Sequence, residues 1–377
     1  MTLMLDSNFD SGAIDLVATD SAVAEVRIRP DLKADGTRSE FVQWFHFRID
    51  GIGSAGARVD FANAGDTTYP AGWNDYRAVA SNDGRRWTRV PTRYDGRTMS
   101  IDLPPVPTMF VAYFEPYSWE RHLALLADCV AGGGRRERLG SSLQGRDLDR
   151  LVVGEGAQPV WIIARQHPGE TMAEWFVEGL LQRLLDPADA VSRELQRMAT
   201  FYIVPNMNPD GSVLGNLRTN AAGANLNREW LQPSAGRSPE VLAVRDALHA
   251  TGCAAFFDIH GDEVLPYVFI AGSEMLPGFS ARQQAEQAAF AADFRAANTD
   301  FQSEHGYSAS KYQDDVLKLA SKYVGHTFGC LSLTLEMPFK DNANAPDAHC
   351  GWSAARSARL GADILGPIQQ HLARSAL

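Results

Sequence analysis

Histidine and carboxylate side chains follow strand-like apolar segments at several places in this 377-residue sequence. His167 and Glu170 stand in the segment HPGE, directly after the apolar run 160–164. Pro168 disfavours helical backbone at residue 167 and Gly169 permits a tight turn, so we expect both side chains at the carboxyl end of a strand. An imidazole and a carboxylate together bind divalent metals, zinc in particular. The alternative is a carboxylate favoured by a helix N-terminus, beside an incidental histidine.

A second histidine, His260, ends the apolar run 254–260. Asp258 precedes it by two residues, so both side chains lie on one face of a strand, where the carboxylate can orient the imidazole. The alternative is a hydrogen-bonded core histidine. With His167 and Glu170, however, His260 completes a set of two histidines and one glutamate. That set binds catalytic zinc and leaves one position open for water.

A further carboxylate, Glu336, stands near the end of the alternating run 331–337. The leucines of this run share one face of the strand, and Glu336 lies on the other face. Hydrolysis at a zinc ion needs a base that takes a proton from water, and Glu336 is the candidate. The alternative is an edge strand with a solvated glutamate.

The segment 204–230 is rich in Asn, Gly and Pro and is predicted to be a long loop after a strand. It contains Arg218 and the pair Asn227 and Arg228. A guanidinium group recognises carboxylates through paired hydrogen bonds. The alternative is loop scaffolding with solvent-facing arginines.

Strands that alternate with helices are expected to position these residues. The predicted strands are 148–154, 159–164, 201–205, 254–260 and 331–337. The predicted helices are 119–130, 172–185, 239–250, 283–297 and 361–373. This order indicates an α/β domain with a mixed, mostly parallel sheet that helices cover on both faces.

The first hundred residues read as short strands with turns between them. The segment 41–50 is aromatic-rich and partly alternating, and Asn82-Asp83-Gly84 and Asp95-Gly96 are turn sequences. This pattern favours an antiparallel β-sandwich. The proline-rich segment 103–107 and one further strand follow. We therefore predict an N-terminal domain over residues 1–112 and a catalytic domain over residues 113–377.

Composition narrows the classes of function. Hydrophobic residues make up 45% of the chain, enough to bury a full core. The net charge of −11 argues against a nucleic-acid partner, and no apolar run is long enough to span a membrane. The N-terminus does not read as a secretory signal. The 4 cysteines form no CxxC pair, so we expect reduced thiols and a cytoplasmic location.

The motifs, in their order along the chain, resemble the zinc metallocarboxypeptidases of the funnelin type. The order is HPGE, NPDG with a following arginine, NLNR, DIHG and a strand that ends in glutamate, over residues 145–340. The sequence is most similar to the cytosolic carboxypeptidase subfamily, which carries an N-terminal β-sandwich. The segments that carry this likeness are 43–48, 69–73 and 113–118.

The resemblance implies roles for individual residues and one Zn²⁺ per chain. It makes His167, Glu170 and His260 the zinc ligands. It makes Glu336 the general base and Arg218 the group that polarises the scissile carbonyl. Asn227 and Arg228 would hold the terminal carboxylate of the substrate. For the family's substrate-contacting tyrosine, Tyr312 is favoured over Tyr323.

The implied reaction is hydrolysis of C-terminal residues from peptide or protein tails. The subfamily removes acidic residues, chiefly Glu, and Lys318 or Lys322 would supply the cation for such a side chain. The alternative is a solvated helix face that carries both lysines and Lys311. A second enzyme hypothesis is a zinc deacylase or amidase that acts on N-acyl amino acids or peptidoglycan peptides. A third hypothesis is an inactive metal-binding scaffold with a β-sandwich binding module.

Overall fold

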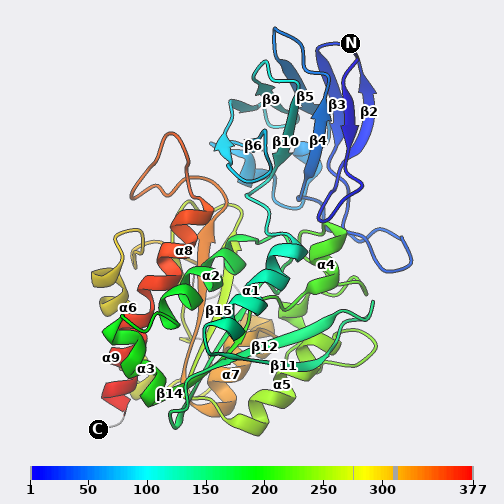
Figure 1. Cartoon of the computed structure of the whole chain (residues 1–377). Coiled ribbons are helices and arrows are strands. Elements are labelled where there is room, and N and C mark those ends of the chain that lie inside the picture. Colours follow the sequence, from blue (N-terminus) through cyan, green and yellow to red (C-terminus); the bar gives the residue numbers. More distant parts are fainter. Residues whose placement is uncertain (1, 275, 309–312, 376–377) are drawn as a thin grey trace.

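Two β-sheets form the N-terminal part of the chain (Figure 1). The computed structural model describes residues 2–274, 276–308 and 313–375. One sheet, in the order β1-β4-β10-β6-β7, is antiparallel throughout. Its strands are β1 (Met4–Asp6), β4 (His46–Asp50), β6 (Val79–Ser81), β7 (Thr88–Arg89) and β10 (Thr108–Ala112). The other sheet, in the order β2-β3-β5-β9-β8, contains one parallel pair, β3 with β5. Its strands are β2 (Asp15–Thr19), β3 (Val23–Arg27), β5 (Ala57–Phe61), β8 (Thr92–Tyr94) and β9 (Met99–Leu103).

Aromatic side chains hold the two sheets together. Phe47 and Ile49 of β4 are fully buried, whereas the residue after each of them is half-buried. A strand with one face on the core requires this alternation. The ring of Phe45, directly before β4, lies 4.7 Å from that of Phe61 in β5 of the other sheet, measured between centroids. The predicted β-sandwich is confirmed, with the parallel pair as a difference. The strand expected over 41–50 begins only at His46.

A mixed sheet in the order β11-β12-β14-β13-β15-β17-β16 forms the C-terminal part. Its central strands β14, β13, β15 and β17 run parallel, and antiparallel strands flank them. The strands are β11 (Arg135–Ser141), β12 (Asp147–Val153), β13 (Gln158–Ala164), β14 (Ala199–Val204), β15 (Ala255–Asp262), β16 (Phe269–Ala271) and β17 (Leu331–Pro338). The predicted mixed α/β sheet is therefore confirmed.

Helices cover both faces of this sheet (Figure 1). Alternate residues of β13 enter different clusters: Val160 and Ile162 pack with α2, α6 and α9, while Trp161 and Ile163 pack with α5 and α7. Burial on both faces explains the continuous apolar runs of the sequence. The helices are α1 (Trp119–Ala131), α2 (Met172–Leu184), α3 (Ala190–Met198), α4 (Pro209–Leu214), α5 (Pro239–Thr251), α6 (Ala281–Ala297), α7 (Ala320–Phe328), α8 (Ala354–Asp363) and α9 (Leu365–Ser375). The helix expected over 361–373 corresponds to α9 and the last residues of α8, and most of α8 was not predicted. No described helix has the length and apolar character needed to cross a membrane.

A buried arginine joins the sandwich to the segment 339–352 that follows β17. Arg89 of β7 donates hydrogen bonds to the carbonyl oxygens of Phe339, Cys350 and Trp352 at 2.8, 3.1 and 2.8 Å, and to that of Arg77 at 2.5 Å. These bonds satisfy a guanidinium group that is 9% exposed. These hydrogen bonds therefore hold the sandwich against the C-terminal part of the molecule.

Candidate active site

The carboxyl ends of three parallel strands bring the predicted acid and histidine residues to one edge of the sheet. His167 and Glu170 follow β13, His260 stands near the end of β15, and Glu336 stands near the end of β17. His260 and Glu336 are direct neighbours in the β15–β17 register. Ligands bind at this edge in open α/β sheets because loops and polar groups gather there.

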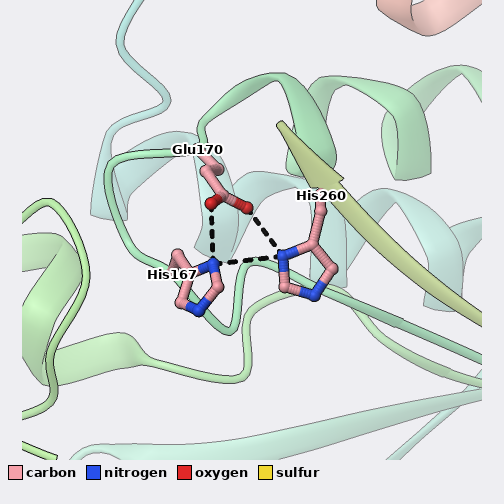
Figure 2. Close-up of side chains that lie close together, drawn as sticks. All are labelled: His167, Glu170 and His260. Atoms are coloured by element: carbon pink, nitrogen blue, oxygen red, sulfur yellow. Dashed lines mark hydrogen bonds and ion pairs between the residues drawn. The ribbon is translucent and has the colours of Figure 1, made fainter. Parts of the chain in front are cut away.

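Three of these side chains form a compact, buried cluster (Figure 2). The Nδ1 atoms of His167 and His260 lie 3.1 Å apart. The carboxylate of Glu170 lies between them, 2.6 Å from Nδ1 of His167 and 2.8 Å from Nδ1 of His260. Two imidazole nitrogens and one carboxylate are the donor set of many catalytic zinc sites. The residues present therefore fit a zinc ion.

The outer ring nitrogens of both histidines have partners of their own. Nε2 of His260 lies 2.9 Å from Oδ1 of Asp258, and Nε2 of His167 lies 3.0 Å from Oδ1 of Asn225. Each oxygen accepts a hydrogen bond from the Nε2–H group, which leaves the Nδ1 lone pair for a metal. The orienting role expected of Asp258 agrees with this geometry. Asn225 had no signal in the sequence, because it reaches His167 from a loop far along the chain.

Charge favours the metal-binding forms of Glu170 and His167; for His260, burial lowers the pKa, but the carboxylates of Asp258 and Glu170 outweigh it and raise the pKa well above its usual range. Burial raises the pKa of Glu170, but the neighbouring imidazoles outweigh it and hold the pKa well below its usual range. Burial, with the positive charge of Arg218 added, lowers the pKa of His167 to about 3. A carboxylate that stays ionised and an imidazole that stays neutral are both ready to bind a cation.

Glu336 is a buried glutamate, 6% exposed, at the wall of the same site. Its Oε1 accepts a hydrogen bond from the hydroxyl of Tyr307 at 3.0 Å, while Oε2 has no partner among the described residues. Burial raises the pKa of Glu336 to about 8; the charge of His260 opposes this rise, and the carboxylates of Glu170 and Asp262 add to it. A carboxyl group of this kind can both accept and return a proton near neutral pH.

A cavity of ≈ 560 Å³ opens in front of the cluster. All seven predicted site residues that the structure describes line it: His167, Glu170, Arg218, Asn227, Arg228, His260 and Glu336. The eighth, Tyr312, lies outside the described residues. The cavity has the size of a small-molecule site, which suits one or two amino-acid residues of a substrate.

Three polar residues of the long loop, Arg218, Asn227 and Arg228, line the cavity. The loop is not wholly irregular, because α4 and a short 3₁₀ helix, η3 (Leu226–Arg228), lie within it. Asn227 accepts a hydrogen bond from the backbone N–H of Ala320 at 2.8 Å, and Arg228 donates to the carbonyl oxygen of Asn227 at 2.6 Å. The guanidinium group of Arg218 lies 4.0 Å from the carboxylate of Glu263. Two guanidinium groups thus border the cavity.

Tyr307 is a site residue that sequence reasoning missed. Its hydroxyl lies 2.6 Å from Oδ2 of Asp262 and 3.0 Å from Oε1 of Glu336. The other candidate, Tyr323, lies elsewhere, because its hydroxyl contacts Nε2 of His249 at 2.9 Å and its ring packs against Trp230. Tyr307 comes from an irregular segment before α7, where no periodic pattern marks a side chain that points inward.

The two candidate lysines differ in position. Lys322, in the first turn of α7, is 7% exposed and lines the cavity, whereas Lys318 is exposed and does not line it. Burial lowers the pKa of Lys322 to about 8, and the charges of Glu274 and Asp258 oppose that shift. The solvated helix face considered for these lysines is therefore wrong for Lys322.

Two family models match successive parts of the chain. One, described as the cytosolic carboxypeptidase N-terminal domain, matches residues 5–114, and the other, described as zinc carboxypeptidase, matches residues 134–349. This chain belongs to the zinc carboxypeptidase family. As a zinc carboxypeptidase, it is a hydrolase that acts as an exopeptidase.

Relatives of this zinc carboxypeptidase include proteins of known structure. A metallo-carboxypeptidase from Burkholderia cenocepacia is 56% identical, with a TM-score of 0.95, over 99% of this chain and 100% of its own. A metallo-carboxypeptidase from Pseudomonas aeruginosa is 45% identical, with a TM-score of 0.92, over 98% of this chain and 100% of its own. Human cytosolic carboxypeptidase 6 is 27% identical over 89% of this chain and 72% of its own length. The zinc carboxypeptidase thus shares both of its parts with the cytosolic carboxypeptidases.

Proposed function

We propose that this enzyme removes acidic residues, chiefly glutamate, from the C-termini of peptides or proteins, with one zinc ion per chain. The observation that carries the proposal is the buried ammonium group of Lys322 in the wall of the cavity that holds Glu336 and both guanidinium groups. A buried cation is costly unless an anion pairs with it. The carboxylate of a glutamate side chain is such an anion.

The chain's own residues divide the work of hydrolysis. His167, Glu170 and His260 would hold the zinc ion, which would supply a Lewis acid that lowers the pKa of water and polarises a carbonyl group. Glu336 accepts a proton from the attacking water through its cavity-facing carboxyl group and later delivers it to the leaving amine. Water thereby supplies the hydroxyl of the new carboxyl group as the C–N bond breaks. Tyr307 holds Glu336 in place through its hydroxyl.

Three further groups act on the substrate itself. Arg218 donates hydrogen bonds to the carbonyl oxygen as negative charge develops there. Asn227 and Arg228 bind the terminal carboxylate, so a peptide without a free C-terminus loses their contribution. The Pseudomonas aeruginosa relative was solved in complex with (2-guanidinoethylmercapto)succinic acid. This ligand carries a guanidino group as well as two carboxyl groups, so its name supports a carboxylate-binding site but gives no support to the preference for acidic side chains.

Replacement of Lys322 tests the proposed preference. We expect Lys322→Ala to lower kcat/KM for a Glu-ended peptide by about 10- to 100-fold. This is the change expected when a hydrogen bond between charged groups is lost. Cleavage of a matched Leu-ended peptide should stay within about twofold, because its side chain needs no cation. Lys318→Ala is the matched control, since that exposed lysine precedes α7 and does not line the cavity. An unchanged ratio of Glu to Leu cleavage in Lys322→Ala would refute the preference.

The pH dependence of selectivity offers a second test. Lys322 carries its charge below its pKa of about 8 and loses it as the pH rises. We therefore expect the ratio of kcat/KM for Glu-ended over Leu-ended peptides to be constant below pH 7. Above pH 8 it should fall by up to about tenfold per pH unit. Titration of a group that acts on both peptides alike, such as Glu336, cancels in the ratio. A ratio that stays flat to pH 10 would contradict the assignment.

The proposed partners are acidic C-terminal tails rather than nucleic acids or membranes. The net charge of −11 opposes general binding of polyanions, so recognition of an acidic tail depends on the local cations of the cavity. The cysteines Cys129, Cys253, Cys330 and Cys350 are free thiols. This supports a reducing compartment, and we propose the cytoplasm.

A further inference from the structure

A segment of the β-sandwich runs alongside the loop that carries Arg218. The backbone N–H and C=O of Leu32 bond to the side-chain amide of Asn216 at 2.7 and 2.8 Å. The backbone N–H of Ala34 donates to the carbonyl oxygen of Ala221 at 2.8 Å. These bonds flank Arg218 on both sides in the sequence. The sandwich thus fixes the path of the loop before and after this residue.

Asp31 binds the centre of the same loop. Its carboxylate is 2% exposed and accepts hydrogen bonds from the backbone N–H groups of Leu217, Arg218 and Thr219 at 2.6, 2.9 and 2.9 Å. The hydroxyl of Thr219 donates a fourth bond at 2.9 Å. Hydrogen bonds to an ionised acceptor are strong, and burial strengthens them further. Successive N–H groups directed at one carboxylate leave little freedom in the backbone dihedrals of Arg218.

The sandwich also contacts the guanidinium group of Arg218. Its Cζ lies 5.9 Å from the ring centroid of Phe41 and 5.6 Å from that of Tyr69. Cations within about 6 Å of an aromatic face are attracted to it. Phe41 is tied to Asp31, because the backbone N–H of Asp31 donates to the carbonyl oxygen of Phe41 at 2.8 Å. One structural unit therefore holds both ends of the arginine.

We propose that Asp31 is a positioning residue for Arg218, and that the β-sandwich is thereby a working part of the active site. The inference rests on the proposed function in one respect, namely that Arg218 stabilises the oxygen of the scissile carbonyl. A donor acts on a developing charge only when it is already in place, and a displacement of about 1 Å can cost about 100-fold in rate. Asp31 supplies that placement without touching the substrate.

A double-mutant cycle tests the coupling. Asp31→Asn keeps an oxygen for some of the four donors but loses the charge. We expect it to lower kcat by about 10- to 100-fold with a much smaller change in KM. In an Arg218→Ala background the same substitution should change kcat by less than about twofold, because the group it positions is gone. Asp35→Asn, an exposed aspartate of the same segment, is the matched control and should leave kcat unchanged.

Equal losses of kcat in both backgrounds, or no loss in either, would overturn the inference while the proposed function stands. Should Asp31→Asn fail to fold, Phe41→Leu enters the same cycle, since Phe41 does not line the cavity. A measurement without substrate tests the positioning role of Asp31 independently of the proposed function. Modification of Arg218 by phenylglyoxal, measured by peptide mass spectrometry, should be several-fold faster in Asp31→Asn, with Arg228 as internal reference. Unchanged labelling of Arg218 would also refute the role of Asp31, whatever the enzyme hydrolyses.

Discussion

Glu336→Gln should lower kcat on a Glu-ended peptide by about 10³-fold, within the range known for loss of a general base. Gln has nearly the same shape and can still contact the hydroxyl of Tyr307, but it cannot accept a proton from water. KM should change little, because Glu336 acts on the reacting water rather than on the bound tail. Steady-state kinetics by mass spectrometry of the shortened peptide measures both constants.

The controls for this variant separate chemistry from folding. Zinc content and thermal stability should match the unmodified enzyme, because the metal-binding cluster does not include Glu336. Glu194→Gln, an exposed position on α3, should retain full activity. If Glu336→Gln keeps most of the activity, Glu336 is not the base and the mechanism proposed above is wrong.

Removal of the metal should abolish hydrolysis. We expect dialysis against a chelator to reduce activity to background, and added Zn²⁺ to restore it. His260→Ala should do the same without restoration, since it removes one of the three donors and leaves a gap opposite Asp258. Zinc content, measured by elemental analysis, should fall from about one equivalent to well below it.

His326→Ala provides the matched control for the metal experiment, because His326 is exposed on α7 and outside the cluster. It should keep both zinc and activity. Full activity in His260→Ala, or in chelated protein that has verifiably lost its metal, would exclude a metal-dependent reaction.

The sequence was most informative where strands end. His167 follows an apolar run, and His260 and Glu336 stand near the ends of two others; the carboxyl ends of parallel strands must meet at one edge. The hydrophobic pattern of the strands and the parallel order of the sheet were therefore sufficient to predict that these three residues lie close together. The same reasoning recovered the orienting position of Asp258, because two residues along a strand return to the same face.

The contacts of loop residues could not be predicted from strand patterns and sheet topology. Asn225, Tyr307 and Asp31 reach the site from irregular segments, where neither period 2 nor period 3.6 says which way a side chain points. Their partners lie tens to hundreds of residues away in the chain. The strand expected over 41–50 was too long for a related reason: its first residues leave the sheet, and Phe41 contacts Arg218 instead.

Secondary structure near the termini was also poorly predicted. Strand β2 carries exposed side chains over much of its length, so the hydrophobic pattern that identifies a strand is weak there. The C-terminal helix divides at Ile364, between α8 and α9, and both helices keep an apolar face. The hydrophobic period of the sequence continues across the break at Ile364, so the pattern gives no sign of the break.

The bonds of Arg89 bear on how this enzyme can change during evolution. Every acceptor of its guanidinium group is a backbone carbonyl, three of them in the segment 339–352. A carbonyl is present whatever side chain the residue has. Mutational drift in that segment therefore leaves the bonds intact as long as the backbone keeps its course. The evolutionary constraint falls instead on position 89, where no other side chain offers as many donors.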